Sequence, residues 1–331
     1  MIRYFSLFVL LLVACGQADR PTAEVAIPTL VATVPWPQPP TPPVTPAAAQ
    51  TMTQIEGEEK TAVTPSPMPP PATPTPTLCT QPGQLERHTF YSPTSGGEMA
   101  YQLYLPPCYG VEDMENGRSY PTLYLLPGNI HDEYAWTRLG IQAIVEAAIA
   151  NGDIPPLLIV MPAGGWLANN TSGGPGSYES FVLNDLIPHL EQTTCAWPNV
   201  NGRALGGLSR GGYWALGIAF RHPDQFVSVG GHSAALLDTH AGPDVNPQYT
   251  GLNNNLGNLR IYLDIGTNDY VIHNIHRLHE DMMAAGIDHT WVLNEGSHEE
   301  AYWTTHLPDY LLWYTAVWPL DPHNYPPCTH P

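Results

Sequence analysis

The chain has 331 residues, of which 43% are hydrophobic and 12% charged, and its formal net charge is −19. A hydrophobic share of this size is sufficient for one large folded domain or two small ones. So acidic a chain excludes a nucleic-acid-binding role, because it would repel the phosphate backbone.

The segment of residues 1–15 has the pattern of an export signal. Arg3 precedes an apolar run that is too short to span a bilayer as a stable helix. The "LVAC" that ends at Cys15 resembles the lipobox of bacterial lipoproteins, in which the cysteine is lipidated and becomes the mature N-terminus. We therefore expect an exported protein that Cys15 anchors to the outer face of the bacterial cell membrane. The alternative is an ordinary signal peptide with a chance cysteine.

Residues 16–78 have the composition of a disordered linker. Positions 21–77 contain 16 Pro and 12 Thr, so this segment cannot bury enough surface to offset its chain entropy. Proline-rich chains are extended and semi-rigid. We expect a stalk that joins the membrane anchor to a folded catalytic domain at residues 79–331.

The folded part alternates strand-like and helical patterns. The patterns predict strands at 84–93, 99–106, 120–128, 155–162, 202–209, 226–235, 259–266 and 289–296. They predict helices at 139–152, 178–192, 210–223, 271–286 and 299–318, with an irregularity at Pro188. The turn residues "TSGG" at 94–97 predict that the first two strands form an antiparallel hairpin. The alternation predicts an α/β fold with a mostly parallel central sheet and helices on both faces.

Ser209 is the candidate nucleophile. It stands in "GLSRG" (207–211), a Gly-x-Ser-x-Gly segment between a predicted strand and a predicted helix. A serine in such an elbow adopts a strained turn, which needs small neighbours. The helix that follows directs backbone N–H groups toward developing negative charge. By itself the pentapeptide does not decide the matter, because short Gly–Ser turns also occur by chance.

The serine needs a base, and histidine is the usual one because its pKa lies near neutrality. Of the 14 histidines, His298 and His232 each follow a predicted strand. Hydrolases with this elbow carry their triad in the order serine, acid, histidine. Only the later histidine leaves room for an intervening strand with the acid, so we prefer His298.

The acid is expected in "YLDIGTNDY", which contains Asp264 and Asp269. Asp269 lies in the loop after the strand, from which a side chain reaches the edge of the sheet where ligands bind. Asp264 lies inside the strand, where we expect a buried hydrogen-bonding residue. We assign the acid to Asp269. The remoter candidates are Asp238, Asp244 and Glu295.

Several segments occur in the order seen in one family: "YPTLYLLPG", "YESFVLNDLIPHLE", "GLSRGG", "LDIGTND" and "GSHEEAYWTTHL". Together they resemble the putative-esterase group of the α/β-hydrolase superfamily, which includes esterase D-type S-formylglutathione hydrolases, feruloyl esterases, enterochelin esterases and mycolyltransferases. The resemblance covers about residues 85–318, and its most specific piece is His298 followed five residues later by Trp303. It implies the α/β-hydrolase fold and a triad of Ser209, Asp269 and His298.

The same resemblance implies an oxyanion hole made of two backbone N–H groups, those of Asn129 and Arg210. The chain departs from many relatives at Pro127, where they have histidine or aspartate before the glycine. Backbone donors survive a change of side chain, so we still expect activity. Trp136 and Trp166 either line an acyl or aromatic pocket or pack in the core.

These features predict a serine esterase that hydrolyses carboxylic esters through an acyl-enzyme, without a metal or an organic cofactor. The expected substrates are carbohydrate esters outside the cell, such as feruloyl or acetyl esters. One alternative is an acyltransferase resembling the mycolyltransferases, which would use the same residues with an alcohol in place of water. The other is a catalytically idle binding protein displayed on the stalk.

Four cysteines remain if Cys15 is lipidated, and an even count in an exported chain favours disulfides. Their spacing lacks the close Cys-x-x-Cys pair of a zinc site. The predicted hairpin would bring Cys79 and Cys108 within the roughly 4.4–6.8 Å Cα separation of a disulfide. Cys195 would then pair with Cys328 and tie down the Pro-rich C-terminal tail.

Overall fold

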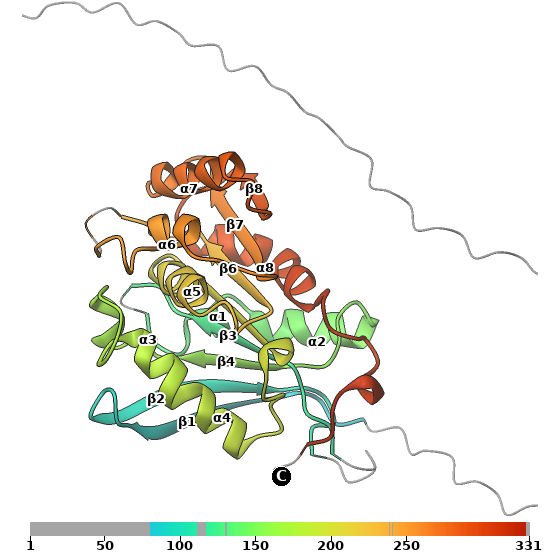
Figure 1. Cartoon of the computed structure of the whole chain (residues 1–331). Helices are drawn as coiled ribbons and strands as arrows, with labels where there is room; N and C mark the ends of the chain where they lie inside the picture. Colours follow the sequence, from blue (N-terminus) through green and yellow to red (C-terminus); the bar gives the residue numbers. More distant parts are fainter. Residues whose placement is uncertain (1–79, 111–116, 130, 238, 240, 329–331) are drawn as a thin grey trace, which may run out of the picture. The chain divides into compact units, whose positions relative to one another are not determined.

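The computed structural model describes residues 80–110, 117–129, 131–237, 239 and 241–328 (Figure 1). The predicted export signal with Cys15, the predicted linker and Cys79 lie outside the described residues, as does Asp238. Contacts along the chain group residues 71–331 into one unit, to which all the described residues belong.

An eight-stranded sheet runs through the described part in the order β1-β2-β4-β3-β5-β6-β7-β8. Its strands are β1 (Gln84–Ser92), β2 (Gly97–Leu105), β3 (Thr122–Leu126), β4 (Leu158–Pro162), β5 (Arg203–Leu208), β6 (Ser228–His232), β7 (Arg260–Gly266) and β8 (Thr290–Asn294). β2 is antiparallel to both β1 and β4, and every neighbouring pair from β4 to β8 is parallel. The predicted N-terminal hairpin and mostly parallel sheet are both confirmed.

The central strands are apolar on both faces because both faces are covered. Every residue of β3 ("TLYLL") and β4 ("LIVMP") is buried, which explains why their sequences do not alternate. The edge strand β1 instead alternates partly buried and exposed positions.

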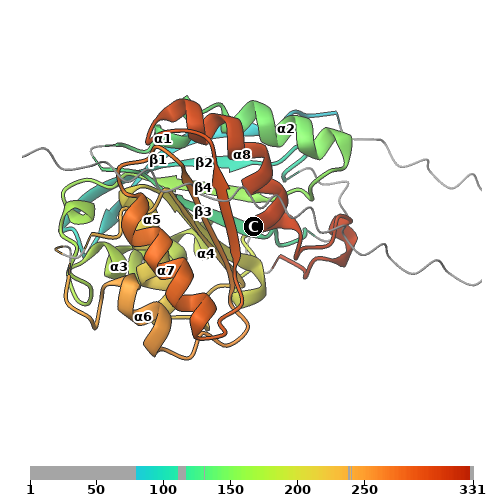
Figure 2. The same ribbon diagram turned by 90° about the horizontal axis from the view of Figure 1, so that it is seen from above.

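Helices form a layer on each face of the sheet (Figure 2). One layer contains α1 (Ala135–Arg138), α2 (Ile141–Asn151) and α8 (Glu300–Thr315). The other contains α3 (Tyr178–Ser180), α4 (Ile187–Thr193), α5 (Arg210–Arg221), α6 (Pro247–Asn253) and α7 (Ile272–Ala284). Each layer buries its own apolar cluster against the sheet, with Val145 and Leu307 on the first face and Trp214 and Ile275 on the second.

The predicted helix over 178–192 is interrupted. A wider, π-helical stretch at Phe181–Leu186 separates α3 from α4. Pro188 has no N–H to donate to the preceding turn, which accounts for an irregularity at this place.

Two helices, α1 and α6, fall where none was expected. The start of α6 has a signal in the sequence, because the Asn246 side chain accepts the Gln248 N–H and Pro247 occupies the first turn.

Candidate active site

Ser209 forms a strained turn between β5 and α5. Its φ of 54° and ψ of −115° lie in a region that residues with side chains rarely occupy. A Cβ on Gly207 would lie 2.2 Å from the Gly211 carbonyl carbon, and a Cβ on Gly211 would lie 2.3 Å from the Leu126 carbonyl oxygen. Such strain costs about 1–3 kcal/mol and persists only where the surroundings impose it. The turn therefore has the shape that the glycine spacing predicted.

The neighbouring strand β6 and the loop that follows it hold the main chain of this turn. The Ser209 N–H donates to the His232 carbonyl at 2.9 Å, and the Ala235 N–H donates to the Ser209 carbonyl at 3.0 Å. Both polar groups of the Ser209 backbone are thus hydrogen-bonded within the protein. These bonds hold the Ser209 backbone in place and so restrict where the hydroxyl lies.

His298 links Ser209 to Asp269. Its Nε2 lies 2.8 Å from Ser209 Oγ, and its Nδ1 lies 2.9 Å from both carboxylate oxygens of Asp269. The Asp269 side chain is fully buried and also accepts the Val271 N–H at 2.9 Å. Because a carboxylate faces Nδ1, that nitrogen carries the ring proton, and Nε2 accepts the hydrogen bond of the serine hydroxyl. The three residues form one hydrogen-bonded chain from acid to imidazole to hydroxyl.

Asn129 lies shortly after β3, and Arg210 lies shortly after β5. The two strands pair in parallel, with Leu126 opposite Gly207. Among the described residues, neither backbone N–H donates to a protein acceptor outside regular helices and strands. The Arg210 guanidinium donates to the Asn169 carbonyl at 3.4 Å, and its burial lowers the pKa of Arg210. Arg210 is the first residue of α5, a position at which a helix leaves the backbone N–H without an intrahelical acceptor.

His232 in β6 and Asp264 in β7 form a second pair, separate from the pair of His298 and Asp269. His232 Nδ1 lies 2.7 Å from Asp264 Oδ1, and both side chains are fully buried. The other ring nitrogen of His232 lies 3.0 Å from the Tyr314 hydroxyl. Asp264 is thus the buried hydrogen-bonding residue that was expected. Asp244 and Glu295 are exposed, and Asp269 already occupies His298 Nδ1.

Trp136 and Trp166 have different surroundings. Trp136 is 1% exposed, and its indole N–H donates to the Leu126 carbonyl at 3.1 Å. Trp136 is therefore a core residue and not a pocket wall, because it offers no surface to a substrate. Trp166 is 63% exposed in the loop after β4, where Gly164 approaches Pro127. Of the two, only Trp166 presents its ring to solvent.

Two further side chains near His298 were not expected. Tyr270 is 75% exposed, and its ring centroid lies 4.6 Å from that of His298. The His131 ring lies against Gly128, where a Cβ would be 2.8 Å from His131 Nδ1. Burial, aided by the charges of Arg138 and His298, lowers the pKa of His131. The position of Tyr270 next to the acid in "TNDY" was the one signal available for it.

Three cysteines, Cys108, Cys195 and Cys328, lie within the described residues. Cys195 and Cys328 form a disulfide with a Cα separation of 5.3 Å. Cys108 is also disulfide-bonded, and its predicted partner Cys79 lies outside the described residues.

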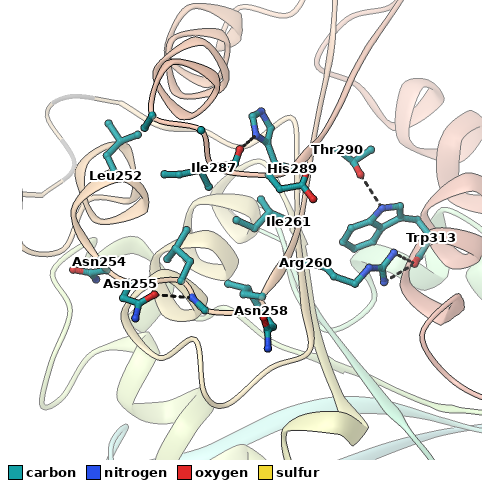
Figure 3. A pocket seen from close by; sticks show the side chains of 16 residues that line it. Leu252, Asn254, Asn255, Asn258, Arg260, Ile261, Ile287, His289, Thr290 and Trp313 are labelled. Atoms are coloured by element: carbon teal, nitrogen blue, oxygen red, sulfur yellow. Dashed lines mark hydrogen bonds between the residues drawn. The ribbon is translucent and has the colours of Figure 1, made fainter. Parts of the chain in front are cut away.

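A cavity of about 730 Å³ lies at the N-terminal ends of β7 and β8 (Figure 3). Ser209, by contrast, follows the C-terminal end of β5. The lining of the cavity includes Arg260 and Thr290, the first residues of β7 and β8. The Arg260 guanidinium lies 4.3 Å from the centre of the Trp313 ring and donates to the Trp313 carbonyl at 3.3 Å. Because Trp313 is in the last turns of α8, Arg260 stabilises the carboxyl end of that helix.

Among the described helices, none has the length and hydropathy that a membrane span requires. The same residues contain no cluster of three or more His, Cys, Asp or Glu side chains arranged to hold a metal ion.

The family profile described as "Putative esterase" matches residues 92–314. An esterase of Mycobacterium tuberculosis is 31% identical over 153 residues, which are 44% of this chain and 31% of the relative. An endo-1,4-beta-xylanase/feruloyl esterase of Xylanibacter ruminicola is 30% identical over 151 residues, which are 44% of this chain and 20% of the relative. A diacylglycerol acyltransferase/mycolyltransferase of Mycobacterium leprae is 31% identical, over 41% of this chain and 42% of the relative. The chain thus spans less than half the length of these relatives.

Solved structures resemble the described part of the chain over most of its length. A ferulic acid esterase superposes with a TM-score of 0.65 at 22% identity, over 72% of this chain and 98% of the other. The S-formylglutathione hydrolase of Staphylococcus aureus superposes with a TM-score of 0.61 at 18% identity, over 70% of this chain and 99% of the other. At these identities the likeness is one of fold.

Proposed function

Because the chain belongs to the putative esterase family and has the α/β-hydrolase fold, we propose that it is a serine hydrolase of carboxylic esters. The observation that carries the proposal is the position of His298, 2.8 Å from Ser209 Oγ and 2.9 Å from Asp269. A nucleophile, a base and an orienting acid within hydrogen-bonding distance are the parts that acyl transfer requires.

In the first half of the reaction, Ser209 Oγ attacks the ester carbonyl carbon while His298 Nε2 takes the hydroxyl proton. The buried Asp269 carboxylate stabilises the imidazolium that forms and keeps the ring in the correct tautomer. His298 then gives the proton to the departing alcohol oxygen, and the acyl group remains on Ser209 as an ester.

The tetrahedral intermediate carries negative charge on the former carbonyl oxygen. We assign its stabilisation to the backbone N–H groups of Asn129 and Arg210, which follow neighbouring strands. The N–H groups at the start of α5 add the favourable field of a helix N-terminus. Loss of one oxyanion donor costs about 10²–10³ in rate.

In the second half, His298 Nε2 takes a proton from water, and the hydroxide attacks the acyl carbonyl. The bond to Ser209 Oγ breaks, the proton returns to Oγ, and the carboxylic acid leaves. Every proton passes through His298, so no metal or organic cofactor takes part in these steps.

We propose a carbohydrate ester as the substrate, with a feruloyl or acetyl acyl group. The support is the similarity to a feruloyl esterase of Xylanibacter ruminicola and to an acetyl esterase of Caldicellulosiruptor saccharolyticus. The exposed rings of Tyr270 and Trp166 offer flat surfaces on which sugars and aromatic acids stack. We also propose that Cys15 attaches the enzyme to the outer face of the bacterial cell membrane.

Acyl transfer to an alcohol is the second candidate, and the similarity to mycobacterial mycolyltransferases favours it. Water and an alcohol would use the same residues, so only the acceptor distinguishes the two activities. A catalytically idle binding protein would need no intact chain of acid, imidazole and hydroxyl, which argues against that alternative.

The test is to incubate the purified protein with a fluorophosphonate probe and to assay aryl acetate and feruloyl esters, with and without sugar acceptors. We expect stoichiometric labelling of Ser209 and release of free acid. Acylated sugar in place of free acid would identify a transferase, and absence of both labelling and turnover would revive the binding protein.

A further inference from the structure

We propose that His232 is a positioning residue, and that its buried pair with Asp264 holds the main-chain segments that carry Ser209, Asp269 and His298. This inference rests on the proposed function. The acyl-transfer steps use neither side chain. Both side chains nevertheless belong to strands β6 and β7, which lead into the part of the molecule where those steps take place.

His232 and Asp264 belong to a fully hydrogen-bonded cluster with three tyrosines of α8. Asp264 accepts from His232 Nδ1 at 2.7 Å, from the Tyr302 hydroxyl at 3.0 Å and from the Tyr310 hydroxyl at 2.6 Å. His232 Nε2 lies 3.0 Å from the Tyr314 hydroxyl. We call these five residues the His–Asp–Tyr cluster.

The cluster has a defined geometry because it is buried and its polar side chains are hydrogen-bonded to one another. His232 and Asp264 are both fully buried, so the Asp264 side chain depends on its three donors. Burial and the Asp264 charge raise the pKa of Tyr310 and Tyr302 well above the usual value, so both hydroxyls remain donors. The His232 ring also stacks on Tyr310 with a centroid distance of 3.7 Å, which fixes its orientation.

The cluster reaches Ser209 through the main chain of His232. His232 is the last residue of β6, and its carbonyl accepts the Ser209 N–H at 2.9 Å. The Ser233 N–H donates to the Asp264 carbonyl at 2.9 Å, which ties the end of β6 to β7. The side-chain contacts of His232 therefore restrain the carbonyl that holds the nucleophile's turn.

The cluster reaches the other two residues through their loops. Asp264 lies in β7, five residues before Asp269. Tyr302 supports the loop before His298, because a Cβ on Gly296 would lie only 2.5 Å from the Tyr302 ring. The three chain segments that carry Ser209, Asp269 and His298 are thus each connected to this cluster.

Two glycines make room for the cluster at the centre of the sheet. A Cβ on Gly206 would lie 2.2 Å from the Tyr314 hydroxyl, and a Cβ on Gly230 would lie 1.9 Å from it. Two glycines in adjacent central strands weaken a sheet, since they add no side chain to the packing. Their place here is explained by the polar group that they admit.

Stability alone is a poor explanation of the cluster. Replacing a buried ionic pair by well-packed apolar side chains is often neutral or stabilising. A shift of about 1 Å in catalytic geometry, by contrast, costs on the order of 10²-fold in rate. A role in positioning therefore predicts a loss in kcat that exceeds any loss of folded protein.

The test compares two substitutions of His232 in the purified protein. His232→Phe keeps a stacked ring and removes both nitrogens, whereas His232→Asn keeps one donor near the place of Nδ1. We expect His232→Phe to lower kcat for an aryl ester about 10–100-fold with KM within about twofold of wild type. His232→Asn should recover at least half of that loss on a logarithmic scale. Tyr124→Phe, which removes a buried hydroxyl in β3 outside the cluster, is the matched control and should stay within about threefold of wild-type kcat.

Titration with the fluorophosphonate probe counts competent sites, so each kcat refers to folded enzyme. A wild-type kcat per titrated site in His232→Phe would overturn the inference, as would equal losses in His232→Phe and His232→Asn. If His232→Phe does not fold, Tyr302→Phe takes its place, and a wild-type kcat there has the same meaning. Ser209→Ala separates the two proposals, because activity in that variant would reject the proposed function itself.

Discussion

His298 Nε2 lies 2.8 Å from Ser209 Oγ, although 89 residues separate them in the chain. The contact arises because β5 and β8 run in the same direction and end at the same edge of the sheet. Loops that follow parallel strands meet at that edge, where ligands of such sheets bind.

Ser209→Ala should lower kcat/KM for aryl esters by on the order of 10⁶, because the variant has no atom to form the acyl-enzyme. The fold should be unchanged, since the contacts of Ser209 to β6 are made by its backbone. Steady-state kinetics and circular dichroism measure the two effects. Turnover at the wild-type rate would reject the assignment of all three residues.

Asp269→Asn should lower kcat by about 10⁴, because the amide no longer enforces the tautomer with the proton on His298 Nδ1. Asp264→Asn should cost less, since Asp264 contacts His232 and not His298. Kinetics of the two folded variants give the comparison. A larger loss in Asp264→Asn would transfer the role of the acid to that residue.

Two glycines of α5 should respond to alanine with opposite signs. A Cβ on Gly211 meets the Leu126 carbonyl at 2.3 Å, so Gly211→Ala should destabilise by about 1–3 kcal/mol. A Cβ on Gly217 has its nearest neighbour at 3.7 Å, so Gly217→Ala should stabilise by about 0.5–1 kcal/mol. Urea unfolding measures both. Equal effects would mean that the turn at Ser209 is less tightly packed than described.

Glu179 should make folding sensitive to acid. It accepts from His222 at 2.7 Å and from the Gly174 N–H at 2.7 Å, and Arg221 lies 2.9 Å away. Burial is the largest single influence and raises the pKa of Glu179, but these three partners together lower it below the usual 4.5. Because the folded-state pKa is depressed, the stabilisation is present above the unfolded value and is lost as the pH falls through the folded one.

The free energy of unfolding of the wild type should therefore exceed that of Glu179→Gln at pH 5, and the difference should shrink as the pH falls toward 2.5. Urea titrations of both proteins at several pH values across this range measure the difference. A difference that does not change with pH would contradict the prediction.

Cys15→Ser should release the protein from membranes. If Cys15 carries the lipid, its loss removes the anchor, because the Pro- and Thr-rich segment 21–77 has no long apolar run to bind a bilayer. Cell fractionation of the wild type and the variant gives the answer, and mass spectrometry of the wild type should find a diacylglyceryl-modified peptide that starts at Cys15. A Cys15→Ser protein that still sediments with membranes would refute the anchor.

Much of the fold could be predicted because its signals are local. The continuous apolar runs of β3 and β4 show that both faces are buried, and the "TSGG" turn shows the hairpin of β1 and β2. Ser209, Asp269 and His298 could be chosen from strand ends and chain order, since parallel strands deliver their loops to one edge.

Tertiary packing decided what the linear pattern left open. Nothing near Trp136 in the sequence shows that its indole donates to Leu126 in the core, and nothing near Tyr270 shows that its ring lies over His298. Nothing near His232 in the sequence shows its hydrogen bonds with Asp264 and with Tyr314 of α8 either. Such contacts depend on how side chains of distant elements fit together, and periodicity along one segment does not record the shape of its neighbours.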